Sequence, residues 1–104
     1  MLINKRLKDK IITTFIVLFF IFHGAMKYSL YKGDEHFFND EYLDAIFYHE
    51  IAVSFFPKTL FRSYEKIIIS YDRLGDSDMV EYYLTEVEEK NIRINPQLKY
   101  TLNK

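Results

Sequence analysis

The sequence predicts an all-α protein with one N-terminal transmembrane helix followed by a small helical domain of three to four helices. The uncharged stretch Ile11–Met26 is apolar enough to enter a membrane. Apolar residues after it recur at three- and four-residue intervals, which is the helical period. No stretch alternates long enough for a sheet. The predicted divisions are a basic terminus (1–10), an anchor (11–30) and a domain (31–104).

The charge distribution separates the two ends of the chain. Four basic residues before Ile11 oppose only Asp9, whereas acidic residues outnumber basic ones after Met26. A short basic end and a mildly acidic domain argue against nucleic-acid binding. The chain has no cysteine, so neither a disulfide nor a thiolate metal site can form.

The anchor is predicted to extend beyond its uncharged stretch. Sixteen residues fall short of the roughly 20 that a span needs. Lys8, Lys10 and Lys27 can extend it by reaching toward the two membrane surfaces, and Tyr28 and Tyr31 suit an interfacial aromatic belt. The residues predicted to face lipid are Ile11, Ile16, Leu18, Phe19, Phe20 and Phe22.

Two alternatives to an uncleaved anchor remain open. A cleaved signal peptide has the same basic and apolar parts, but a cut after Ala25 would place His23 where a small residue is preferred. The stretch could also be a buried core helix of the domain. If the anchor stays, the excess of basic residues before it keeps the N-terminus in the cytoplasm. The domain is then expected to be periplasmic or extracellular.

Helix boundaries in the domain follow from capping and breaking residues. Tyr31–Asn39, with Gly33 and Asp34, is interpreted as a break before a helix that begins near Asp40. Pro57 is expected to end that helix. Its four-residue apolar repeat is Leu43, Phe47, Ile51 and Phe55.

The second half predicts two further helices and a short C-terminal one. Thr59 is a candidate cap and Gly75 a terminator. Asp76, Ser77 and Asp78 form a second capping cluster, with Asp78 and Glu81 spaced as in a capping box. Asn95-Pro96 resembles another helix start. The predicted buried stripes are Leu60, Tyr64, Ile67, Ile68 and Tyr71, then Val80, Tyr83, Leu84 and Val87.

Helix pairs at this spacing resemble the tetratricopeptide repeat. Gly33, Ala45, Ala52 and Pro57 keep that family's intervals between its small residues and closing proline, and Tyr64–Tyr71 and Val80–Leu84 follow parts of its second unit. The resemblance implies stacked helix pairs with a concave binding groove. An ordinary small helical bundle is the alternative. The stretch 55–83 is also similar to the extramembrane tail of O-antigen-ligase-type glycosyltransferases, whose activity needs many spans.

One charged stripe is the candidate partner-binding site. Arg62, Lys66, Ile69 and Arg73 share a face of the predicted second domain helix, and the repeat resemblance implies that this face lines the groove. The alternatives are a solvated face or pairing with the glutamates of the next helix.

Metal and catalytic motifs are incomplete. His49-Glu50 begins a zinc-protease motif, but Val53 stands where the second histidine is needed. His36, His49 and Asp40 are expected to be unconnected, with the histidines partly exposed. No nucleophile elbow or phosphate loop is present. We therefore expect no cofactor, metal, small-molecule substrate or enzymatic activity.

These observations predict a scaffold or accessory subunit of a cell-envelope assembly that binds lipid through residues 11–30. It is expected to contact another envelope protein or a second copy of itself. The alternatives are a regulatory small subunit of a multi-span membrane enzyme, for example in glycan transfer, or a small secreted helical protein.

Overall fold

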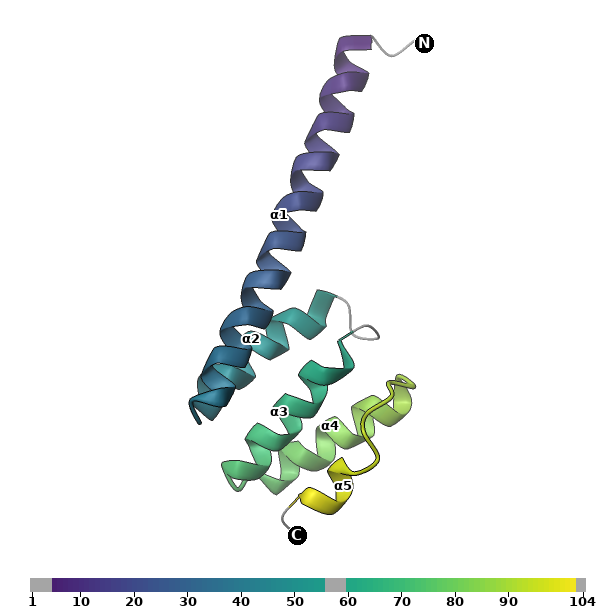
Figure 1. Cartoon of the computed structure of the whole chain (residues 1–104). Helices are drawn as coiled ribbons and strands as arrows, with labels where there is room; N and C mark the ends of the chain where they lie inside the picture. Colours follow the sequence, from purple (N-terminus) through teal and green to yellow (C-terminus); the bar gives the residue numbers. More distant parts are fainter. Residues whose placement is uncertain (1–4, 56–59, 103–104) are drawn as a thin grey trace.

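A computed structural model describes residues 5–55 and 60–102, and all regular structure in these ranges is helical. The helices are α1 (Lys5–Phe38), α2 (Tyr42–Phe55), α3 (Phe61–Arg73), α4 (Ser77–Glu89) and the one-turn α5 (Leu98–Thr101). Figure 1 shows α1 projecting far beyond the other helices, which gather at its C-terminal half. The all-α class is confirmed. The predicted roles of Pro57 and Thr59 lie outside the described residues.

Helix α1 joins the apolar stretch to the domain without a break. Its residues from Lys5 to Ala25 are all exposed, and burial begins at Met26. It is the one described helix long and apolar enough to cross a membrane, although an N-terminal signal sequence satisfies the same criteria. Because its apolar half is uncovered, the alternative of a buried core helix does not fit the described single chain.

The break predicted within Tyr31–Asn39 is wrong. The helix continues through Gly33 and Asp34 to Phe38, and the chain turns at Asn39–Glu41 instead. Asp40 adopts a left-handed conformation with φ 60°, which aspartate tolerates better than most residues. Gly33 is therefore not a turn glycine but a helix residue whose missing side chain makes room for a neighbour.

Helix α2 runs back obliquely along α1, with its C-terminal end toward the apolar half (Figure 1). Its buried face is Ala45, Ile46, His49, Ala52 and Val53. The apolar residues that recur every four positions and predicted this helix lie on its exposed face. Leu43 is 72% and Phe47 60% exposed. Alanines at the buried positions allow the close approach of α1.

Helices α3 and α4 complete the core as predicted. Val53, Tyr64, Ile67, Val87 and Ile92 form one buried cluster, and Ile68, Val80 and Leu98 form the other. Of the two predicted stripes, Leu60, Tyr71, Tyr83 and Leu84 are only half-buried.

The ends of these helices depart from prediction in one detail. Gly75 turns the chain with φ 78°, as expected of a terminator. Within the predicted capping cluster, Asp76 caps α4 by accepting a hydrogen bond from the backbone N–H of Met79 at 3.2 Å. The cap is therefore not the capping box predicted at Asp78. Leu98 of α5 is buried in the core, so the C-terminal segment packs against α3 and α4.

Candidate functional site

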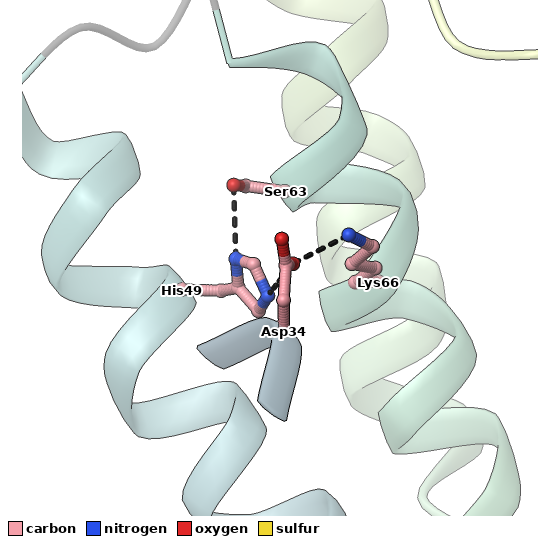
Figure 2. Close-up of polar contacts among 4 residues, drawn as sticks. All are labelled: Asp34, His49, Ser63 and Lys66. Atoms are coloured by element: carbon pink, nitrogen blue, oxygen red, sulfur yellow. Dashed lines mark hydrogen bonds and ion pairs between the residues drawn. The ribbon is translucent and has the colours of Figure 1, made fainter. Parts of the chain in front are cut away.

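Three helices meet at one buried histidine. His49 lies in the middle of α2, Asp34 comes from α1, and Ser63 and Lys66 stand one turn apart on α3. Figure 2 shows the imidazole between Ser63 and Asp34, with Lys66 reaching Asp34 from the other side. We call these four residues the histidine cluster. His49 is 1% exposed, so the expectation of a partly exposed histidine is wrong.

Gly33 makes the position of His49 possible. A Cβ at residue 33 would lie 2.7 Å from Cδ2 and Nε2 of the imidazole, closer than such atoms approach in proteins. Ring and helix backbone are therefore in direct contact. The glycine that predicted a break from the sequence is instead required for packing between α1 and α2.

The contacts of the cluster define its protonation. Nδ1 of His49 lies 2.9 Å from Ser63 Oγ, and Nε2 lies 3.1 Å from Asp34 Oδ1. A carboxylate can only accept, so the ring proton belongs on Nε2, and Nδ1 accepts the Ser63 hydroxyl proton. His49 Nε2 and Asp34 Oδ1 are as close as the atoms of an ion pair, but they are not aligned for a hydrogen bond. The same Asp34 oxygen accepts from the Lys66 ammonium.

Burial dominates the electrostatics of His49. Desolvation lowers its pKa, the charge of Asp34 opposes that shift, and the charge of Lys66 adds to it. The ring is therefore neutral at neutral pH. Lys66 and Asp34 compensate each other, which leaves the cluster without net charge.

The order Ser63, His49, Asp34 resembles the arrangement of a hydrolytic triad, but the Ser63 side chain is almost fully buried. Ser63 is only 2% exposed, whereas a nucleophile must reach the carbon that it attacks. A hollow of about 240 Å³ is lined by three members of the cluster, Asp34, Ser63 and Lys66. Its other wall residues are Leu30, Leu60, Phe61 and Arg62. The arrangement as it stands holds α1, α2 and α3 in one register.

The predicted partner-binding stripe is divided by the structure. Arg62, Lys66 and Ile69 line a hollow of about 340 Å³, which we call the α3 groove. Arg73, the last residue of α3, is exposed and lies outside its wall. The remaining wall residues are Phe37, Glu65, Asn95, Gln97, Leu98 and Thr101.

The contacts of Lys66 match neither alternative for the stripe, a solvated face or ion pairs with the glutamates of the next helix. Its partner is Asp34 of α1, not a glutamate of α4. Glu65 accepts from the backbone N–H of Asn95 at 2.9 Å, which fixes the C-terminal segment against α3. The groove thus has an apolar floor of Phe37, Ile69 and Leu98, with the Arg62 guanidinium at its rim.

The histidines do not gather into one metal site. Within the described ranges, His36, Glu41 and Asp44 have ligand atoms within 4.8 Å of one another. Both carboxylates are exposed, and the His36 ring stacks on Tyr48 at 5.4 Å. Asp40 instead accepts from the Tyr42 hydroxyl. These contacts explain the histidine without an ion.

No protein-family model, curated protein or solved structure matches this chain. The likenesses to the tetratricopeptide repeat and to the ligase tail therefore rest on the sequence alone.

One feature of the sequence indicates that His49 is buried, and it follows from helical periodicity. His49 stands four residues after Ala45 and three before Ala52, so all three share a helix face. A face with two alanines favours close contact with a neighbour, which places the histidine in that contact. Its partners on α1 and α3 follow only from tertiary structure.

Proposed function

We propose that the protein is a single-pass, membrane-anchored helical scaffold or accessory subunit that acts by binding another protein of the cell envelope. The observation that carries this proposal is the continuity of α1. One helix is exposed and uncharged from Ile11 to Ala25, and it becomes the first packing helix of the domain at Met26. An anchor so joined would hold the domain at a fixed position relative to the bilayer.

The orientation follows from charge. Lys5, Arg6, Lys8 and Lys10 precede the apolar half, and basic residues are retained on the cytoplasmic side. The domain then lies in the periplasm or outside the cell. The chain lacks cysteine, so single cysteines introduced at Lys8 and Tyr82 can be labelled from outside with a membrane-impermeant maleimide. The proposal requires labelling at residue 82 and none at residue 8; the opposite pattern would reverse the orientation.

The α3 groove is the surface proposed for the partner. Its apolar floor lies between α1, α3 and the C-terminal segment. Stacked helix pairs need about three units to bury their faces, and with at most two units this side would stay uncovered. The tetratricopeptide likeness would make it the concave side. Partner binding thus involves Ile69 and Arg62, while the histidine cluster beneath fixes the walls.

A photo-crosslinking amino acid at Ile69 tests this function in native membranes. A discrete adduct with another envelope protein, or with a second copy of the chain, supports a scaffold. The matched control replaces Tyr82, which is 53% exposed on α4. Equal adducts from both positions, or none from Ile69, would refute groove binding.

A further inference from the structure

The uncharged exposed part of α1, from Ile11 to Ala25, is too short to cross a bilayer by itself. It rises about 21 Å, whereas the hydrocarbon core is about 30 Å thick. The domain already reaches α1 within this part, because the rings of Phe22 and Phe55 lie 5.8 Å apart. If the anchor spans 11–30, its last eight residues lie beside α2. The bilayer must therefore accommodate that end of the domain.

Among the described residues, the last turn of α2, which lies nearest the anchor, is apolar. From Ile51 to Phe55, α2 carries no charged residue, while Glu41 and Asp44 stand at its opposite end. Phe55 is 37% exposed and Phe61, at the start of α3, is 40% exposed. Phe55 continues the exposed surface of α1 through its contact with Phe22, and Phe61 lies beside Leu30 of α1 at the hollow that both line. Nothing in the described domain covers them.

Flanking residues suit a lipid boundary at this level. Tyr28 and Tyr31 on α1 are 55% and 66% exposed, as an interfacial aromatic belt would be. The Arg62 guanidinium lies over the Phe61 ring at 5.8 Å, so its charge can reach headgroups while the ring faces lipid. Lys27 is exposed on α1 and can extend to the same surface.

We propose that the end of the domain formed by Phe55 and Phe61 is immersed in the outer leaflet beside α1, with Tyr28 and Tyr31 at the headgroups. This inference rests on the proposed anchor. The occupant of the aromatic surface is then lipid rather than a protein partner, and the depth of the chain decreases along α2 from Phe55 toward Leu43. The domain is thereby fixed against the membrane at two points instead of one.

The chain contains no tryptophan, so single-tryptophan variants report depth without background. We would reconstitute the full chain carrying Phe15→Trp, Phe55→Trp, Phe61→Trp or Leu43→Trp in phosphatidylcholine vesicles with brominated acyl chains. Circular dichroism verifies that each variant keeps the parental helix content. Expected are strong loss of emission at residue 15, comparable loss at 55 and 61, and little loss at 43.

The outcomes separate this inference from the anchor itself. Quenching at residue 15 without quenching at 55 and 61 would leave the anchor and overturn immersion of the domain. No quenching at residue 15 would overturn both. Blue-shifted but unquenched emission at residues 55 and 61 would show that protein covers them and would also overturn the inference. If one of these two variants misfolds, the other decides.

Discussion

The imidazole of His49 occupies the space that a side chain at residue 33 would need. A Cβ there would meet ring atoms at 2.7 Å, and both partners belong to helix interiors that cannot easily move. This contact sets the separation of α1 and α2. Because α1 is also the proposed anchor, the same contact determines how the domain is held at the membrane.

Gly33→Ala is expected to destabilise the domain despite the better helix propensity of alanine. Overpacking against a buried ring costs about 1–3 kcal/mol in the free energy of unfolding. The matched control is Gly24→Ala, where a Cβ would meet nothing within 4 Å. Thermal unfolding of both full-length variants in detergent micelles makes the comparison. Equal melting temperatures for the two would contradict the account of Gly33.

Ser63→Ala is expected to lower the free energy of unfolding by about 1–3 kcal/mol, because Nδ1 of buried His49 would lose its partner. Ser54→Ala is the control, since the Ser54 hydroxyl is exposed and donates only to the Ile51 carbonyl of its own helix. Chemical denaturation followed by circular dichroism measures both. A loss at residue 54 as large as that at 63 would argue against the cluster.

Stability is expected to fall as the pH is lowered through the mildly acidic range. Burial lowers the pKa of His49 in the folded chain, whereas the unfolded chain protonates it near about 6.5. Below that pH the unfolded state binds more protons, so the free energy of unfolding decreases toward the folded pKa. Above it the contribution is fully present.

His49→Gln should remove this pH dependence, and His36→Gln should retain it. Denaturant midpoints of the full chain and both variants, measured between about pH 7.5 and 5, give the comparison. The slope attributable to one proton is at most about 1.4 kcal/mol per pH unit. A slope that survives in His49→Gln would assign the titration to another group.

Arg62→Glu is expected to weaken partner crosslinking from Ile69, because it reverses charge at the rim of the α3 groove. Arg73→Glu makes the same charge change on the same helix outside the groove and should leave the adduct unchanged. Adduct yield in native membranes is the measurement, with helix content checked for both variants. Loss in both would indicate a general charge effect and not a groove contact.

Exchange of Ile11–Ile21 for an unrelated apolar segment of equal length separates the scaffold from a regulatory subunit of a membrane enzyme. A scaffold keeps its partner adduct because binding lies in the domain. A regulator that packs laterally inside the bilayer loses its effect with its own anchor residues. The yield of the Ile69 crosslinking adduct, measured before and after the exchange, distinguishes the two functions. Loss of the adduct would favour the regulatory subunit.

Local sequence patterns predicted the helices but not the contacts between them. The stripe through Tyr64, Ile67 and Ile68 and the terminator Gly75 needed only periodicity and backbone preference, and they were correct. Gly33 was misinterpreted because a glycine at a turn and a glycine beneath a ring are identical in sequence.

The site was predictable only in part for the same reason. Arg62, Lys66 and Ile69 share a helix face by spacing, and three members of the stripe do line a hollow. The Asp34 partner of Lys66 is 32 residues away and no local rule connects them. The large exposed residues of α2 led to the wrong buried face for this helix, because an exposed apolar stripe has the same period as a buried one.

The central claim is that residues 11–30 remain in the membrane as part of the mature chain. Alkaline carbonate extraction of native membranes, followed by detection of the chain and its apparent size, tests this most directly. The account predicts that the uncleaved chain stays with the membrane pellet. Release into the supernatant, or a mature chain that begins near Met26, would contradict it.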